Sequence, residues 1–149
     1  MSPLSRFGIN FIAFAQNSAP WAARLAIAIV YFWFGALKLF GLSPASPMAQ
    51  ALVDSTVGAA LFDPLFLLLA LWECLLGLLF LWPRATRVAI PLLFLHLAVV
   101  SAPLAIVPSL AWNGFLVPSL EGQYIIKNVL IVAAALCVAA SLPTKPKQA

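Results

Sequence analysis

The sequence has little charge of either sign. Only 8% of its 149 residues are Asp, Glu, Lys or Arg, and 64% are hydrophobic, whereas about a quarter of the residues in a soluble domain are charged. This composition excludes an ordinary soluble domain, and its hydrophobicity excludes a disordered chain. The basic residues are dispersed and lie in no nucleic-acid-binding motif, so we expect no nucleic-acid partner.

The sequence is equally poor in residues that hold redox centres. Cys74 and Cys137 do not form a CxxC pair, and we interpret them as small packing residues. His96 is the only histidine, so one chain cannot supply two histidine ligands to a haem. Glu73 and Cys74 are neighbours, and neighbouring side chains on a helix point about 100° apart, so they fit poorly as metal ligands together with His96. We predict no metal site and no self-contained redox centre.

Long apolar stretches are what the sequence has in abundance. Four of them, at residues 21–41, 62–82, 88–107 and 120–142, are long enough to cross a bilayer of about 30 Å, which takes about 20 helical residues. Polar residues do not alternate with the apolar ones, so helices rather than barrel strands must satisfy the backbone. The sequence predicts an all-α membrane protein, with an antiparallel bundle of four transmembrane helices over residues 21–142 and the lipid bilayer around it.

The segments that flank the spans predict smaller elements. In residues 1–20, Leu4, Phe7, Phe11 and Phe14 fall on one helical face, which is typical of an amphipathic helix that lies in the membrane interface. A second short amphipathic helix is predicted in the outer loop between the first two spans. Residues 143–149 are predicted to form a cytoplasmic tail.

Charges outside the predicted spans indicate the topology. Six basic residues share one side of the predicted bundle with no acid among them: Arg6, Arg24, Arg84, Arg87, Lys145 and Lys147. Asp54, Asp63 and Glu121 fall on the other side. Because segments rich in Lys and Arg stay in the cytoplasm, we predict that both termini and the turn between the second and third spans are cytoplasmic.

Four ionisable residues, one per span, are predicted to lie within the membrane: Lys38, Glu73, His96 and Lys127. Counted from the turn between their spans, Glu73 and His96 both lie about 13–14 Å from the inner edge at a rise of about 1.5 Å per residue, so they can share a proton or form an ion pair. The same count puts Lys38 and Lys127 about 21 and 24 Å from that edge, in the outer third. Pro103 is expected to break the third helix near its outer end and make room there.

Each of these residues also has a purely structural interpretation. A lysine in the outer third can reach the headgroups, a buried glutamate can join helices, and a lone histidine is more often a packing residue than a ligand. Their convergence favours a ligand-binding cavity that is polar and open to the outer side. In that cavity Lys38 and Lys127 would supply positive charge, and Glu73 with His96 would accept or relay a proton.

Two further patterns concern packing. Gly35 lies one turn from Lys38, and Gly77 lies one turn from Glu73, so both are expected to allow close approach of helices. The aromatic run from Tyr31 to Phe34 is expected to be core or lipid-facing, with the wall of a quinone site as the alternative.

Three short motifs resemble those of DoxX-like integral membrane proteins. The stretch "RLAIAIVYFWFGALKLFG" is similar to their first helix, "ECLLGLLFL" to their second and "EGQYIIKNVLIVAAAL" to their fourth. The resemblance is nearest to the branch that includes reactive-chlorine-resistance membrane proteins, and it covers residues 24–142. It is carried by Arg24, Gly35, Lys38, Glu73, Gly77, Gly122 and Lys127, whereas His96 has no counterpart in the family pattern.

The resemblance implies a bacterial inner-membrane protein that is the membrane subunit or accessory of a redox or oxidative-stress system. It implies a quinone or a small anion as the ligand, and a protein partner or a second copy of the chain as the associate. Two alternatives remain open. One is a non-enzymatic scaffold subunit of a membrane complex, and the other is a small transporter or channel, which would require oligomerisation because four spans are few.

Overall fold

The computed structural model of the chain describes residues 3–143, with side chains from Arg6 onward. Four helical runs are long and apolar enough to cross a membrane: Arg6–Leu39, Ala59–Leu81, Thr86–Ile106 and Leu120–Ala140. The prediction of an all-α protein with four potential spans is therefore confirmed at this level. The predicted tail at residues 143–149 lies, apart from Pro143, outside the described residues.

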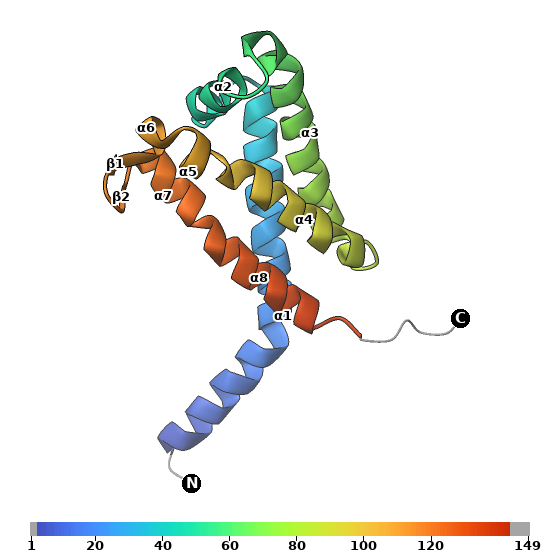
Figure 1. Cartoon of the computed structure of the whole chain (residues 1–149). Coiled ribbons are helices and arrows are strands. Elements are labelled where there is room, and N and C mark those ends of the chain that lie inside the picture. Colours follow the sequence, from blue (N-terminus) through green and yellow to red (C-terminus); the bar gives the residue numbers. More distant parts are fainter. Residues whose placement is uncertain (1–2, 144–149) are drawn as a thin grey trace.

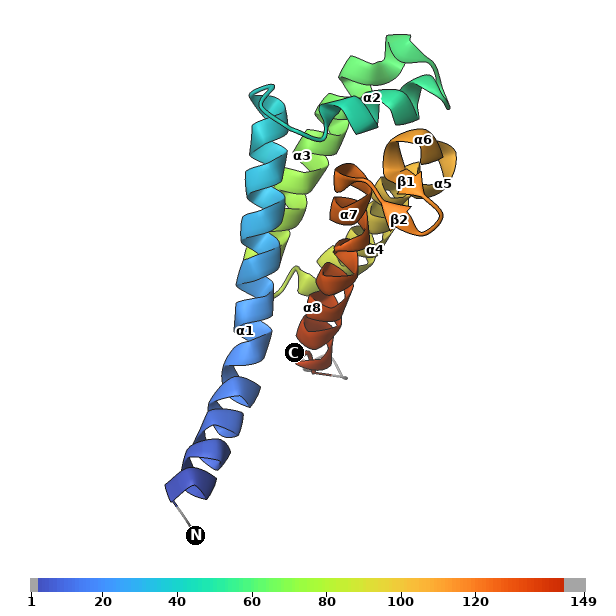
Figure 2. The same cartoon turned by 90° about the vertical axis from the view of Figure 1, so that its left-hand side faces the viewer.

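The first helix differs from the prediction at its start. We expected a separate interfacial helix at residues 1–20, but α1 (Pro3–Leu39) is continuous and contains Pro20. Its N-terminal part extends beyond the other helices and bends away from the direction of the rest (Figures 1 and 2), and proline within a helix is a common cause of such a bend. At its other end Gly41, with φ of +68°, follows the last turn, and this left-handed conformation is favourable for glycine at a helix end.

The second and third spans lie close to their predicted bounds. α3 (Phe62–Leu81) ends at the turn that contains Pro83, and α4 (Thr86–Ser101) follows. A short helix, α5 (Pro103–Ile106), continues the third span after an interruption at Ala102. The predicted break at Pro103 is therefore confirmed.

The fourth span has an interruption that the sequence did not predict. α7 (Leu120–Ile126) and α8 (Asn128–Ala140) meet at Lys127, whose backbone stays in the right-handed helical region at φ −61° and ψ −15°. The amide of Leu130 donates to the carbonyl of Lys127 at 3.0 Å, a spacing of three residues that tightens the helix locally. The span therefore continues through Lys127 in one direction.

The remaining elements lie between the spans. The loop after α1 contains the predicted short helix, α2 (Ser46–Asp54), and a 3₁₀ turn, η1 (Ala59–Leu61). Between α5 and α7 the chain forms α6 (Pro108–Ala111) and an antiparallel hairpin of β1 (Trp112–Gly114) and β2 (Val117–Pro118). The sequence predicted no strands, because strands of three and two residues are too short to show alternation.

The long helices form two crossing pairs. α1 packs along α3, while α4 and α8 run obliquely across them (Figures 1 and 2). The α3–α4 turn and the C-terminal end of α8 lie at one end of the bundle, which we call the turn end. α2, η1 and the hairpin lie at the other, which we call the cap end (Figure 1).

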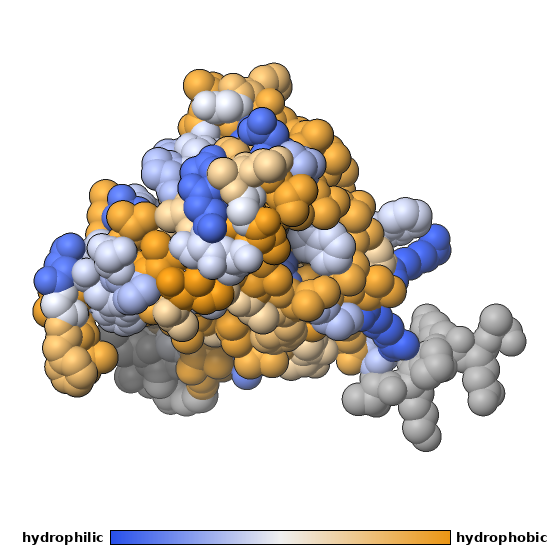
Figure 3. Space-filling view, turned by 45° about the horizontal axis from the view of Figure 1, so that its top comes forward, coloured by the Kyte–Doolittle hydropathy of each residue, from blue (hydrophilic) through white to orange (hydrophobic). Residues whose placement is uncertain are grey.

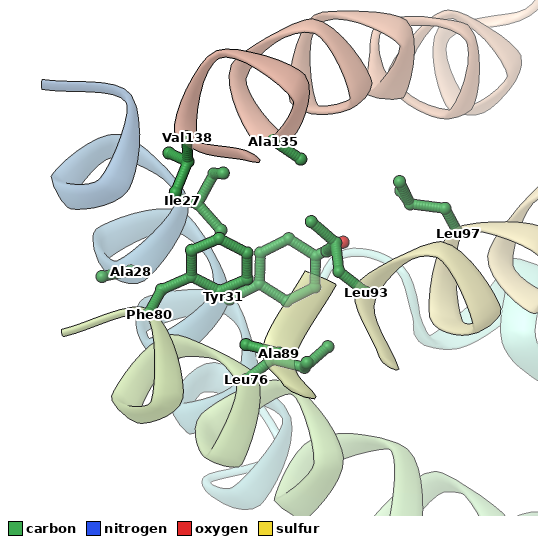
Figure 4. Packing of buried hydrophobic residues seen from close by; sticks show 10 residues of the cluster. All are labelled: Ile27, Ala28, Tyr31, Leu76, Phe80, Ala89, Leu93, Leu97, Ala135 and Val138. Atoms are coloured by element: carbon green, nitrogen blue, oxygen red, sulfur yellow. The ribbon is translucent and has the colours of Figure 1, made fainter. Parts of the chain in front are cut away.

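The hydrophobic core joins all four long helices (Figure 4). Its buried members come from each helix in turn: Ile27, Ala28, Tyr31, Leu76, Phe80, Ala89, Leu93, Leu97, Ala135 and Val138. Outside this core the flanks are largely apolar, with hydrophilic residues scattered over the cap end (Figure 3). An apolar exterior of this kind suits a bundle whose solvent is lipid.

Candidate functional site

Three of the four predicted site residues meet inside the bundle. Lys38 Nζ donates to Glu73 Oε2 at 2.6 Å, and His96 Nε2 lies 3.6 Å from Glu73 Oε1. Their side chains are 7%, 9% and 4% exposed, respectively. We call Lys38, Glu73 and His96 the polar cluster. The carboxylate of Glu73 lies at its centre, between a cation and an imidazole.

Helix geometry explains why Lys38 reaches Glu73 rather than the headgroups. The Cα–Cβ bond of a helical residue tilts toward the N-terminus of its helix. In the antiparallel α1 and α3, Lys38 therefore leans into the bundle while Glu73 leans toward the cap end. The 2.6 Å contact is the result, and Lys38 does not extend outward as the snorkelling alternative requires.

Two glycines bring α1 and α3 close enough for this pairing. A Cβ at Gly35 would lie 2.8 Å from the backbone oxygen of Ala70, and a Cβ at Gly77 would lie 2.7 Å from the backbone nitrogen of Phe32. Any larger residue would force the two helices apart. The predicted packing role of Gly35 and Gly77 is therefore confirmed, and it fixes the helix spacing on which the polar cluster depends.

Tyr31 adds an aromatic wall to the polar cluster. Its ring meets that of His96 edge to face, with centroids 5.2 Å apart and an interplanar angle of 68°. Tyr31 is only 5% exposed, whereas Trp33 and Phe34 in the same aromatic run are more than half exposed. The run therefore has one core residue beside the cluster and others that face outward.

Lys127 does not join the other three residues. It is exposed, and its Nζ lies 5.3 Å from the centre of the Tyr124 ring on the same helix. Within residues 3–143 no hydrogen bond or ion pair links Lys127 to the polar cluster. The expected cavity lined by all four residues is thus replaced by a compact cluster of three, with Lys127 apart from it.

A second buried charge was missed at the sequence level. Arg24 was interpreted as a topology signal, but it is only 6% exposed and its Nη1 donates to the carbonyl oxygen of Phe80 at 2.9 Å and to Oγ1 of Thr86. Trp21 also lies against the guanidinium, 5.5 Å from its ring centre. We call this arrangement the Arg24 brace. It ties α1 to the end of α3 and the start of α4, where a cation is favourable beside helix C-terminal carbonyls.

The sequence contains one signal for the Arg24 brace, which is the position of a basic residue at the start of an apolar run. A basic residue that begins an apolar run can be either an interfacial charge or a partner for buried carbonyls. Phe80 lies in the last turn of α3, whose final carbonyls have no partner within the helix. The tight turn at residues 82–85 made an interhelical donor at this level plausible.

Two hollows are present, and none of the residues of the polar cluster lines either of them. One, of about 150 Å³, is a groove between α1 and α8, lined by Ala26, Ile27, Val30, Leu130, Ile131 and Ala134. The other, of about 240 Å³, lies at the hairpin. In the part of the chain that the structure describes, no three His, Cys, Asp or Glu side chains gather as a metal would require.

The chemical capacities of the two buried sites differ. Lysine, glutamate and histidine each exist in protonated and deprotonated forms, whereas a guanidinium remains a cation and donates only. The 3.6 Å separation between His96 and Glu73 is longer than an N–H···O hydrogen bond. That contact leaves hydrogen-bonding capacity on both groups, whereas the Arg24 guanidinium already donates to two acceptors.

No protein-family model, curated protein or solved structure matches the chain. The fold is that expected of an all-α, multi-pass membrane protein with a buried polar cluster. The resemblance to DoxX-like proteins stays a prediction.

Proposed function

We propose that this protein is a DoxX-like component of a bacterial inner membrane that binds a quinone headgroup at the polar cluster. It would serve as the membrane subunit or accessory of a redox or oxidative-stress system. The observation that carries the proposal is the contact of three proton-exchanging side chains, Lys38, Glu73 and His96, inside a bundle of membrane-spanning length. Ionisable groups at such depth are costly and are commonly kept for function.

The charges of the polar cluster favour a quinone over a small anion. Lys38 is already paired with Glu73 at 2.6 Å, so its positive charge is offset by a carboxylate. Lys127, the second expected source of positive charge, lies apart. An anion would therefore meet little net attraction, while the carbonyl oxygens of a quinone need only hydrogen-bond donors. Lys38 and the N–H of the His96 imidazole supply such donors.

The groove between α1 and α8 offers a place for the apolar part of such a ligand. Its lining residues are all aliphatic, and two of them, Ile27 and Val30, lie within one helical turn of Tyr31. The Tyr31 ring in turn contacts His96. An isoprenoid chain in the groove would thus lie near the wall of the polar cluster, an arrangement of apolar lining and few polar groups that is typical of ligand sites.

The polar cluster would also manage the protons of the reaction. A quinone that accepts electrons from a partner redox protein takes up protons to become a quinol. In the proposed site Glu73, ionised beside Lys38, would take up a proton and pass it to His96, which would give it to the quinone oxygen. Two such transfers, with two electrons from the partner protein, would give the quinol and return Glu73 to the carboxylate that Lys38 stabilises. The electron donor would be the partner protein, since this chain has no predicted redox centre of its own.

Mass spectrometry of small molecules retained by the protein tests the proposal. Three proteins would be purified gently from the native membrane: the parent, Lys38→Met/Glu73→Leu and Lys127→Met. The double variant replaces the pair with apolar side chains, and Lys127→Met is the matched control outside the cluster. We expect quinone with the parent and with Lys127→Met but not with the double variant. Equal retention by all three, or no binding by the parent in quinone-loaded liposomes, contradicts the proposal.

A scaffold role is the second candidate, and one observation favours it. Only 11% of the most apolar window of the fourth span is buried, against 28% or more for each of the other three. Apolar side chains such as Val129 and Leu130 are more than 60% exposed on this span. A partner could cover this face. If the protein purifies in a stable complex that dissociates when Val129, which does not line the groove, is replaced by Trp, while quinone binding is absent, the scaffold role is the better account.

A further inference from the structure

The hairpin of β1 and β2 presents a continuous apolar tip. Phe115, Leu116 and Val117 follow one another, and they are 93%, 73% and 55% exposed. Phe115 is the most exposed of the large hydrophobic residues in the described part of the chain. Exposure of three adjacent large apolar side chains to water is unfavourable, so their surroundings require an explanation.

The hairpin is held firmly at its base. Trp112 Nε1 donates to the carbonyl oxygen of Leu104 at 2.9 Å, and Ser119 donates from its backbone nitrogen to Ala111 and from its hydroxyl to Leu110. Gly122 packs so closely that a Cβ there would lie 2.1 Å from the carbonyl oxygen of Ala111. These contacts fix the direction in which the tip projects.

The turn at the tip is itself unusual. Leu116 has φ of +57°, the only positive φ among the described non-glycine residues. Leucine is uncommon in the left-handed region, where Asn, Asp or Gly is typical. The turn thus contains a large apolar side chain where a small or polar residue would be favoured, which points to a requirement for apolar contact at this position.

The location of the hairpin indicates what meets the tip. The hairpin connects the end of the third span at Ile106 to the start of the fourth at Leu120, so it lies at the level of one membrane surface. It projects to the side of the bundle beside the start of α7 (Figure 1). Residues 107–119 contain no charged side chain, whereas α2 at the same end contains Asp54.

We propose that the hairpin tip inserts into the leaflet at the cap end, with Phe115, Leu116 and Val117 among phospholipid acyl chains. Apolar residues of interfacial elements are buried about 5–10 Å into the boundary between headgroups and acyl chains. Trp112, at the base, lies where aromatic residues are enriched at membrane surfaces. The hollow at the tip, lined by Trp112, Gly114, Phe115 and Leu116, has an apolar lining that can accept part of an acyl chain.

Depth-dependent fluorescence quenching tests this insertion. A polarity-sensitive dye would be attached at Phe115→Cys, and at Ser55→Cys as the matched control, in a chain with Cys74→Ala and Cys137→Ala. Ser55 follows α2 at the same end of the bundle and is also exposed. Each protein would be placed as a single copy in nanodiscs of phosphatidylcholine and phosphatidylglycerol. The two quenchers are a nitroxide on the lipid chain and iodide in the water.

We expect blue-shifted emission at position 115, with stronger quenching by the lipid nitroxide than by iodide, and the reverse ranking at position 55. The same ranking at both positions, with iodide the stronger quencher, overturns the proposal. The proposal is also overturned if position 115 is protected from iodide only in nanodiscs that hold several copies, because a second copy would then cover the tip. If the labelled chain fails to fold, Phe115→Trp and Ser55→Trp in the otherwise unaltered chain, each measured against the parent with brominated lipids, give the same comparison.

Discussion

The two buried charged sites of this protein differ in what surrounds the charge. In the Arg24 brace a cation meets two neutral acceptors, the carbonyl oxygen of Phe80 and the hydroxyl of Thr86, near the turn end. In the polar cluster a cation meets an anion, and a third titratable group lies 3.6 Å away. The brace has no group that changes its charge, and it joins elements that are already close. The comparison teaches that two equally buried charges can differ in chemistry: the neighbours of Arg24 have fixed charge, whereas those of Glu73 can exchange protons.

The largest expected effect comes from breaking the pair in the polar cluster. Glu73→Leu leaves Lys38 in the bundle without its counter-ion, and removal of one partner of a buried pair costs about 3–5 kcal/mol. The double variant Lys38→Met/Glu73→Leu should recover most of that stability, because two apolar side chains of similar size can replace a buried pair at little cost. Unfolding of the reconstituted proteins measures both. A double variant as unstable as Glu73→Leu alone would contradict the account.

Arg24→Met is expected to be about as destabilising but functionally silent. It removes two hydrogen bonds that a charged donor makes, each worth about 1.5–3 kcal/mol. The carbonyl oxygen of Phe80 and the hydroxyl of Thr86 then lose this donor. Thr86→Val removes one acceptor and should cost about half as much. In the fraction that folds, quinone binding should equal that of the parent, as measured by retention on the purified protein. Loss of binding in well-folded Arg24→Met would break the distinction between the two sites.

His96→Phe should show the opposite separation of effects. Phenylalanine keeps an aromatic ring against Tyr31 and a similar volume, and volume-conserving changes in a core usually cost less than about 1.5 kcal/mol. The proton-exchanging nitrogen is lost, however. The rate of proton uptake as added quinone is reduced in proteoliposomes, followed with a pH-sensitive dye, should fall to the rate in liposomes without protein. Uptake equal to that of the parent would remove His96 from the proposed relay.

The smallest effect is expected for Lys127→Met. Its cation–π contact with Tyr124 is exposed and is worth about 0.5–1 kcal/mol. We therefore expect a shift in unfolding free energy no larger than this and unchanged quinone retention. If Lys127→Met lost as much retained quinone as the double variant, Lys127 would have to join the polar cluster in a conformation that differs from that of the structure.

The sequence was sufficient for the architecture because apolar length is a strong signal. Each of the four spans could be located from its run of apolar residues, and the break at Pro103 followed from the missing amide of proline. α1 begins well before the span predicted from residue 21, because the helix continues through Pro20 with a bend. The sequence did not predict the hairpin because strands of three and two residues are too short to show an alternation of polar and apolar side chains.

The polar cluster could be predicted only in part, for a geometric reason. Depth along the membrane gave the neighbouring levels of Glu73 and His96, and it placed Lys38 in the outer third, as part of the same cavity but not as the direct ion-pair partner of Glu73. Depth counts refer to Cα positions, whereas a lysine side chain extends several bonds along its helix and leans toward the N-terminus. The same count grouped Lys127 with Lys38, although rotation about the helix axis, which depth does not specify, directs it elsewhere.

Infrared difference spectroscopy of the reconstituted protein, recorded as added quinone is reduced electrochemically, tests the central claim most directly. The account predicts changes in a carboxyl band that is absent from Glu73→Gln and in an imidazole band that is absent from His96→Phe, both unaltered in Arg24→Met and Lys127→Met. Spectra in which neither Glu73 nor His96 responds to the redox state of the quinone would contradict the account and leave the polar cluster as a structural link between α1, α3 and α4.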